Sequence, residues 1–297
     1  MLSDRARSTA ILNRHTRAGG FVLLRRVGGG GQADVYMARP AGGGWRAALA
    51  AIKVARPCHA AGLHDEHGWL ASPAADHPGL SRLYSRQHGG PGDLGYVEVP
   101  GAGRVPFLAL AYVPGRSLAD LLARRGGRGL PPCLSAHIAA RAASALGHLH
   151  RRLGIVHQDV RPANLIVGPG RQPHVTLIDL GVAESLGAPR RRCDYGARGY
   201  LAPERLSGAP ASALADVYSL GITLRAMLGD QPAPPDLADL IRDATLGDPQ
   251  DRAAAIPDMA AMLGRLQIAD YRLEKDNAYC SWLALAHVGA ARGVLRR

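Results

Sequence analysis

Near the middle of the chain, residues 157–164 read HQDVRPAN and residues 177–181 read LIDLG. The first segment offers the carboxylate of Asp159 and the amide oxygen of Asn164, and the second offers the carboxylate of Asp179 after an apolar run. Transfer of a phosphoryl group from a nucleoside triphosphate needs a base beside the accepting hydroxyl and oxygen ligands for Mg²⁺. The order and spacing of these residues therefore predict a phosphoryl-transfer site.

Upstream, a glycine cluster and a lysine indicate where phosphates would be held. Residues 27–36 read VGGGGQADVY and lie between β-rich runs, where bare backbone could approach a triphosphate. A plain hairpin turn explains the glycines equally well. Lys53 lies in the next β-rich run, residues 47–54, and is one of only two lysines in a chain with 36 lysines and arginines. A lone strand lysine is ordinarily a solvated edge residue, so its role depends on the segments described above.

Together these segments resemble the protein kinase family, especially the bacterial Ser/Thr kinases, over residues 21–266. The resemblance implies ATP and Mg²⁺ as cofactors, with Asp159 as catalytic base and with Asn164 and Asp179 as metal ligands. Residues 202–204 (APE) and 216–221 (DVYSLG) match further family elements. By the same resemblance Glu204 pairs with Arg252, Glu66 pairs with Lys53, and the residues that contact ATP are Gly28, Gly30, Val35, Ala51, Lys53, Glu66, Leu110, Ala111 and Val113.

The pattern of residue types predicts a small β lobe joined to a larger helical lobe, and the resemblance implies an α+β, bilobal, protein-kinase-like fold. Short β-rich runs up to residues 105–113 predict a small antiparallel β N-lobe, and helical spacing beyond Pro114 predicts a larger helical C-lobe. The expected parts are a flexible basic arm at 1–20, a kinase-like domain at 21–266 with its N-lobe at 21–110, hinge at 111–115 and C-lobe at 116–266, and a C-terminal helical tail at 267–297.

Several residues depart from the family pattern. Gln158 stands where many kinases have an arginine that binds a phosphate on the activation loop. In this chain that loop corresponds to residues 179–204, and its central positions carry no hydroxyl. We therefore expect activity that does not require phosphorylation of the loop. Arg161 replaces a lysine and can still neutralise charge on the transferred group, which makes it a catalytic candidate. Ala197 replaces a threonine, but Pro162 keeps the Ser/Thr pattern, so a serine or threonine hydroxyl is the expected acceptor.

Other departures keep alternatives open. Gly62, Gly68 and Pro73 predict a short or broken helix around Glu66. Residues 229–236 read GDQPAPPD and leave little room for a helix that often docks protein substrates in the family. The alternatives to a protein kinase are a pseudokinase that binds nucleotide or partners, and a small-molecule phosphotransferase of related fold.

Charge and composition give few specific clues about partners. The net charge of +12 would attract anions, but a solvated basic arm is favoured over binding to nucleic acid or a membrane surface. Hydroxyls in that arm are candidate autophosphorylation sites, and the protein substrate is unknown. We expect no transmembrane segment and a cytoplasmic location, since the cysteines are scattered and no secretion signal is visible.

Histidines invite other readings. Cys58, His59, His64 and His67 have irregular spacing, so a zinc site is not favoured. His148 and His150 are expected on the surface or at a helix end. His157 is expected to support the backbone of residues 157–164, which we call the catalytic loop.

Overall fold

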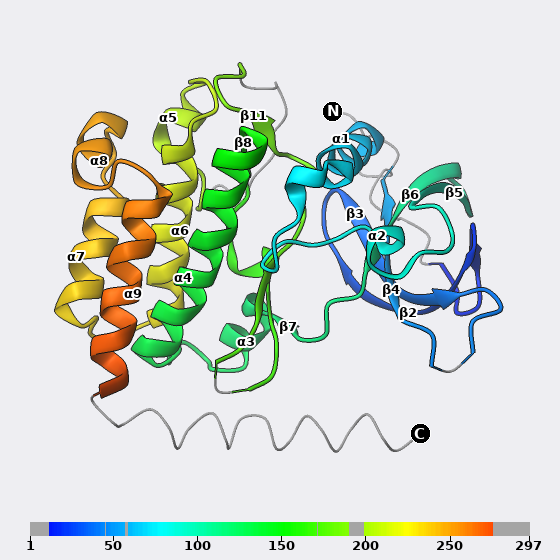
Figure 1. Ribbon diagram of the computed structural model, residues 1–297, viewed down its shortest axis with the longest axis horizontal. Coiled ribbons are helices and arrows are strands. Elements are labelled where there is room, and N and C mark those ends of the chain that lie inside the picture. Colours follow the sequence, from blue (N-terminus) through cyan, green and yellow to red (C-terminus); the bar gives the residue numbers. More distant parts are fainter. Residues whose placement is uncertain (1–11, 45, 57–58, 171, 190–198, 276–297) are drawn as a thin grey trace. The chain divides into compact units, whose positions relative to one another are not determined.

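The computed structural model describes residues 12–44, 46–56, 59–170, 172–189 and 199–275. The chain forms two compact units, the first from Met1–Asp76 with Ser81–Val113 and the second from His77–Leu80 with Pro114–Arg297 (Figure 1). The first is rich in strands and the second in helices, which confirms the expected division of secondary structure.

The first unit is built on an antiparallel sheet with the strand order β1-β2-β3-β4-β6-β5. Strands β2, β3 and β4 follow one another along the chain as neighbours, as expected for a meander of short β-rich runs separated by turns. The elements of this unit are β1 (Arg17–Ala18), β2 (Phe21–Gly29), β3 (Ala33–Pro40), β4 (Ala50–Ala55), α1 (Ala60–Ala71), the 3₁₀ turn η3 (Pro73–Ala75), α2 (Tyr84–His88), β5 (Leu94–Val99) and β6 (Gly103–Ala111).

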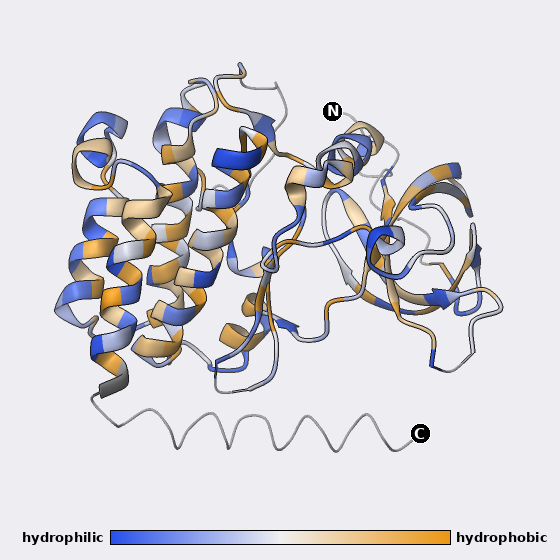
Figure 2. Cartoon of the chain, in the orientation of Figure 1, coloured by the Kyte–Doolittle hydropathy of each residue, from blue (hydrophilic) through white to orange (hydrophobic). Residues whose placement is uncertain are grey.

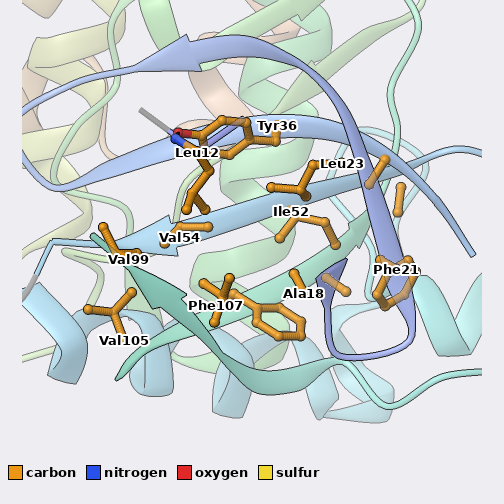
Figure 3. Packing of buried hydrophobic residues seen from close by; sticks show 14 of the residues in the cluster. Leu12, Ala18, Phe21, Leu23, Tyr36, Ile52, Val54, Val99, Val105 and Phe107 are labelled. Atoms are coloured by element: carbon orange, nitrogen blue, oxygen red, sulfur yellow. The ribbon is translucent and has the colours of Figure 1, made fainter. Parts of the chain in front are cut away.

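One face of this sheet carries the hydrophobic core of the first unit (Figure 3). Both phenylalanines of the chain, Phe21 and Phe107, lie in it with an exposed fraction of no more than 1%. Phe21 meets Tyr84 edge to face, with ring centroids 5.1 Å apart. Aromatic rings bury more apolar area than other side chains, so these few rings fill much of a core that is otherwise made of small aliphatic residues.

The N-terminal segment corrects one expectation. Residues 12–20 were assigned to a flexible arm, but Leu12 and Ala18 are buried in the core, and β1 pairs with β2. The backbone N–H of Leu12 also donates to Tyr36 Oη at 3.1 Å. The basic composition of this stretch hid two apolar residues that the sheet needs to cover its core. Residues 1–11 lie outside the described part of the chain.

Long helices dominate the second unit. In Figure 2 hydrophobic stretches alternate with hydrophilic ones along α4, α6 and α9, and α4 packs against both other helices. The elements of this unit are β7 (Arg116–Ser117), α3 (Leu118–Ala123), α4 (Pro132–His148), the π-helical turn η4 (Leu149–Leu153), β8 (Ile155–Val156), the 3₁₀ turn η5 (Pro162–Asn164), β9 (Leu165–Val167), β10 (Val175–Leu177), β11 (Glu184–Ser185), α5 (Pro203–Leu206), α6 (Ala213–Leu228), α7 (Pro235–Ala244), α8 (Pro249–Ala255) and α9 (Met259–Lys275).

Two further features of the second unit bear on its function and boundaries. Residues 229–234 between α6 and α7 form no helix, as the GDQPAPPD segment predicted. Helix α9 runs without a break past residue 266, where the kinase-like domain was expected to end and a tail to begin. Residues 276–297 lie outside the described part.

A glycine opposite Phe107 offers a test of the core. Gly95 pairs with Phe107 across β5 and β6, and a Cβ at Gly95 would lie 2.6 Å from the Phe107 ring. Because the ring is enclosed, we expect Gly95→Ala to lower the free energy of unfolding by about 1 to 3 kcal/mol. Urea unfolding followed by tryptophan fluorescence measures this, with Gly92→Ala as control because a Cβ there meets nothing within 4 Å. Equal stability of the two variants would contradict this account of the core.

Candidate active site

Strand register in the first unit places the expected ATP-contacting side chains on one face of the sheet. Val35 pairs with Lys53, and Ala51 pairs with Leu110. Paired residues share a face, and residues two apart on a strand do too, so these four side chains lie together. The opposite face carries the core described above, including Ile52 between Ala51 and Lys53.

Lys53 is held by a buried ion pair. Its Nζ donates to Glu66 Oε2 at 2.5 Å, and the two side chains are 8% and 0% exposed. Glu66 comes from α1, which is continuous from Ala60 to Ala71 and not short or broken as Gly62 and Gly68 predicted. Burial of Leu63, Glu66 and Leu70 on one side of α1 outweighs the cost of about 1 kcal/mol for each interior glycine.

The glycine-rich turn between β2 and β3 leaves room for a ligand at its tip. A Cβ at Gly30 or Gly31 would meet nothing within 4 Å, and neither residue has the positive φ that requires glycine. No protein contact therefore explains these glycines, and their bare backbone fits the close approach of a phosphate. Gly29 differs, because a Cβ there would collide with Arg26 and Asp34, which form an ion pair at 2.6 Å.

The backbone N–H of the last residue of β6 is hydrogen-bonded within the protein. The N–H of Ala111 donates to the carbonyl of Arg82 at 2.9 Å. Contact between the Ala111 backbone and an adenine stays a prediction. Leu110 and Val113 lie on either side of this position.

In the second unit the carboxylate of Asp159 is held from one side. Its Oδ2 accepts from Asn164 Nδ2 at 2.7 Å and from Arg161 Nε at 2.9 Å. Asp159 is 6% exposed, and its Oδ1 is buried without a hydrogen-bond partner among the described residues. A buried carboxylate oxygen without a hydrogen-bond partner is costly, so Oδ1 is the atom of this carboxylate that a ligand could contact.

Asn164 and Asp179 lie on adjoining segments. The N–H of Ile178 donates to the Asn164 carbonyl at 3.0 Å, and Asn164 Nδ2 donates to Asp159, so Oδ1 is the side-chain atom of Asn164 that can act as an acceptor. Asp179 has a left-handed backbone with φ of 72°, and its Oδ1 accepts from Gly181 N–H at 3.2 Å. An amide oxygen and a carboxylate are hard oxygen donors, so this pair fits Mg²⁺ when phosphate oxygens complete its shell.

A residue whose role the sequence left unassigned organises this loop. Asp216 on α6 is fully buried, and its two carboxylate oxygens accept from the backbone N–H groups of His157 at 2.8 Å and Gln158 at 3.0 Å. Gln158 has a φ of 69°, a left-handed backbone that is uncommon outside glycine and needs support from its surroundings. In the sequence, the sign of this role was the charged residue Asp216 among the apolar residues at the start of α6.

Two more polar residues of α6 hold neighbouring backbone. Thr223 Oγ1 donates to the Val160 carbonyl at 3.2 Å, and Ser219 Oγ donates to the Tyr200 carbonyl at 2.8 Å. Asp216, Ser219 and Thr223 follow helical spacing, so they lie on one face of α6. This face carries the catalytic loop.

The histidines near this loop are interior residues. His157 is fully buried, with Nδ1 accepting from Asp159 N–H at 3.2 Å and Nε2 placed 3.2 Å from the Ile178 carbonyl, which confirms its role as a brace. His150 lies just past the end of α4, which is one of the two places expected for it, but it does not lie on the surface. Its side chain is 7% exposed, and Nε2 lies 2.8 Å from Asp216 Oδ2. The π-helical turn that follows α4 turns His150 inward.

The remaining expectations have mixed outcomes. Arg252 Nη1 donates to Glu204 Oε1 at 2.6 Å, which confirms that pair. Among the described residues, no group of three or more histidine, cysteine, aspartate or glutamate side chains is arranged to hold a metal ion. None of the described helices combines the length and the hydrophobicity that a membrane span needs. Cys58 and Ala197 lie outside the described residues.

The charge state of Asp216 makes the stability of the protein depend on pH. Burial would raise the pKa of Asp216, but the hydrogen bond and charge of His150 and the contacts of His157 lower this pKa below its ordinary value. A carboxylate with a lowered folded-state pKa stabilises the fold above its ordinary pKa of about 4, and this contribution is lost as the pH falls below it.

We expect Asp216→Asn to unfold more easily by about 3 to 5 kcal/mol near neutral pH, as when a buried pair is broken. The gap between variant and wild type should narrow as the pH is lowered from about 7 to below the ordinary carboxyl pKa of about 4, because the stabilisation that comes from the charge of Asp216 is then progressively lost. Urea unfolding across this pH range measures both quantities. A gap that stays constant with pH would show that the Asp216 charge does not support the loop.

Comparisons with known proteins agree with this geometry. The family model of the protein kinase domain matches residues 21–245. Serine/threonine-protein kinase PknB of Mycobacterium leprae is 32% identical over 163 residues, which are 54% of this chain and 24% of that protein. The dual specificity mitogen-activated protein kinase kinase dSOR1 of Drosophila melanogaster is 33% identical over 129 residues, which are 43% of this chain and 32% of that protein. The chain thus matches only about a quarter to a third of the length of these relatives.

A solved structure confirms the fold class. The crystal structure of the Mycobacterium tuberculosis PknI kinase domain matches with a TM-score of 0.61 at 23% sequence identity, covering 87% of this chain and all of that one. The family model alone accounts for well over half of the residues. The chain therefore has the bilobal kinase fold and belongs to the protein kinase family of phosphotransferases.

Proposed function

We propose that this protein transfers the γ-phosphoryl group of ATP to a serine or threonine hydroxyl of a protein. The observation that carries the proposal is the Asp159 carboxylate. One of its oxygens is fixed by Arg161 and Asn164, and the other is buried with no hydrogen-bond partner in the part of the chain that the structure describes. A base fixed in this way can take the hydroxyl proton without first giving up another hydrogen bond.

Several described residues have the chemistry that phosphoryl transfer needs. Lys53, oriented by Glu66, holds phosphate oxygens with its ammonium group, and the bare backbone at Gly30 admits the phosphates closely. Asn164 and Asp179 would hold Mg²⁺, which offsets phosphate charge when it is bound. Asp159 Oδ1 accepts the hydroxyl proton while the new oxygen–phosphorus bond forms, the bond to the bridging oxygen breaks, and ADP leaves.

Two finer features belong to the same proposal. Gln158 carries no charge with which to bind a loop phosphate, so we propose that turnover does not require loop phosphorylation. The simplest first acceptor is a hydroxyl of the protein's own N-terminal segment, which would be modified by autophosphorylation. Of its candidate hydroxyls, Thr16 lies in the described part and is half-buried, whereas Ser3, Ser8 and Thr9 lie outside it.

A second candidate function is phosphoryl transfer to a small molecule. The short, non-helical link 229–234 between α6 and α7 favours this function. Kinases of the family often have a helix at this place that docks protein substrates, and this link has none. The chemistry at Asp159 would be the same, and only the acceptor would differ.

We expect intact-mass analysis to show phosphate added by the wild type in MgATP, either to itself or to generic protein acceptors. Asp159→Asn should reduce the rate by about a thousandfold, because the amide cannot take the hydroxyl proton. ATP affinity should stay within about twofold, since Asp159 acts on the acceptor and not on the nucleotide. Peptide mapping of the product then identifies the modified residue type.

Controls separate the possible failures of this proposal. Phosphate on tyrosine alone would contradict the assignment to serine and threonine. ATP binding without transfer to any protein would contradict the assignment as a protein kinase. If the protein then consumed ATP when a mixture of small alcohols was added as acceptors, that result would favour the second candidate. A wild type pretreated with phosphatase should keep its initial rate, and a large fall would contradict independence from loop phosphorylation.

A further inference from the structure

Three side chains meet in the interior beside the catalytic loop: Gln158, Glu184 and Arg205 are 8%, 7% and 3% exposed. Arg205 Nη2 donates to Glu184 Oε2 at 2.5 Å, and Arg205 Nε donates to Gln158 Oε1 at 3.1 Å. Gln158 Nε2 in turn lies 3.4 Å from Glu184 Oε2. We call these three residues the buried clamp.

The clamp joins three segments that are far apart in sequence. Gln158 adjoins Asp159 in the catalytic loop. Glu184 lies in β11, which pairs with β8, the strand that enters that loop. Arg205 lies in α5, and its Nη1 also donates to the carbonyl of Ala209. The clamp therefore ties the catalytic loop to both ends of the segment between residues 184 and 205.

The chemistry of position 158 suits this arrangement. An amide can accept from a guanidinium and donate to a carboxylate at the same time. An arginine at 158 could only donate, and it would place two cations around the single carboxylate of Glu184. A glutamate at 158 could only accept, and it would repel Glu184. With glutamine, the amide adds no charge to the ion pair between Arg205 and Glu184 and hydrogen-bonds to both of its members.

Backbone contacts extend the effect of the clamp. Directly after Glu184, the N–H of Leu186 donates to the Gly154 carbonyl and the N–H of Gly187 donates to the Ala211 carbonyl, each at 2.8 Å. Directly before Arg205, Glu204 pairs with Arg252. Both ends of the segment are thus held against the rest of the second unit by contacts that involve no added phosphate.

We propose that Glu184, Arg205 and Gln158 are positioning residues that do permanently what a phosphate on the loop does in a phosphorylation-dependent kinase. They hold the catalytic loop, and with it Asp159, in the geometry for transfer. This inference rests on the proposed function, and it explains how that function would dispense with phosphorylation. A buried ion pair that served stability alone would not affect the rate per folded molecule.

The test compares Arg205→Gln with Arg242→Gln in the full chain. Both changes remove an arginine that forms ion pairs, but Arg242 lies on α7 with a side chain that is 65% exposed, and its partners are Asp239 and Asp243. Hydrogen–deuterium exchange is read at the amides of His157, Gln158, Leu186 and Gly187. Turnover is measured as kcat and KM for ATP, per molecule that binds ATP.

We expect Arg205→Gln to speed exchange at those four amides by about tenfold or more, and to lower kcat by about tenfold or more with KM for ATP within about twofold. Arg205→Lys should recover part of kcat because it restores the charge. Gln158→Arg should lower kcat as Arg205→Gln does, since it upsets the charge balance of the clamp. Arg242→Gln should match the wild type in all readouts.

Unchanged exchange at the four amides in Arg205→Gln would overturn the proposal, and so would an unchanged kcat per folded molecule. Failure of the proposed function looks different, because the wild type and Arg242→Gln would then also transfer no phosphate. In that case faster exchange in Arg205→Gln would still support the clamp as the element that holds the loop, and unchanged exchange would still overturn it.

Discussion

The hydrogen bonds from His157 and Gln158 to the buried carboxylate of Asp216 are the interaction on which the second unit depends. They hold consecutive backbone N–H groups in the interior, and one of these residues has a left-handed backbone that would otherwise relax. Because Asp159 follows directly, its orientation is inherited from this contact. Burial alone would raise the pKa of Asp216, but the hydrogen bond and charge of His150, together with the charge and backbone hydrogen bond of His157, lower this pKa below its ordinary value.

Helix α6 gives this contact a rigid base. Asp216, Ser219 and Thr223 share a face, and each of them fixes backbone of a different segment near the site. The buried clamp adds a second layer beside them, because Gln158 is held through its backbone by Asp216 and through its side chain by Arg205. Catalytic geometry of this kind needs positions held within a fraction of an ångström, and helices hold side chains more firmly than loops do.

Much of this could be predicted from the sequence. The alternation of residue types gave the division into strands and helices, and the spacing of Asp159, Asn164 and Asp179 indicated groups that do lie on adjoining segments. Other features depend on contacts between distant residues. The clamp joins positions 158, 184 and 205, and no local pattern relates them. His150 was expected on the surface or at a helix end. It does lie at the end of α4, but local spacing cannot show that the π-helical turn there directs its side chain inward. Leu12 was hidden in a basic stretch because charge dominated the composition there.

The most direct test of this account is the single-turnover rate of phosphoryl transfer by Asp216→Asn, measured with saturating MgATP near neutral pH and scaled to the fraction of molecules that bind ATP. If the Asp216 anchor positions the base, the variant should bind ATP as the wild type does and yet transfer phosphate about as slowly as Asp159→Asn. A folded Asp216→Asn protein that transfers phosphate at the wild-type rate would contradict the account, because Asp159 would then be positioned without the anchor.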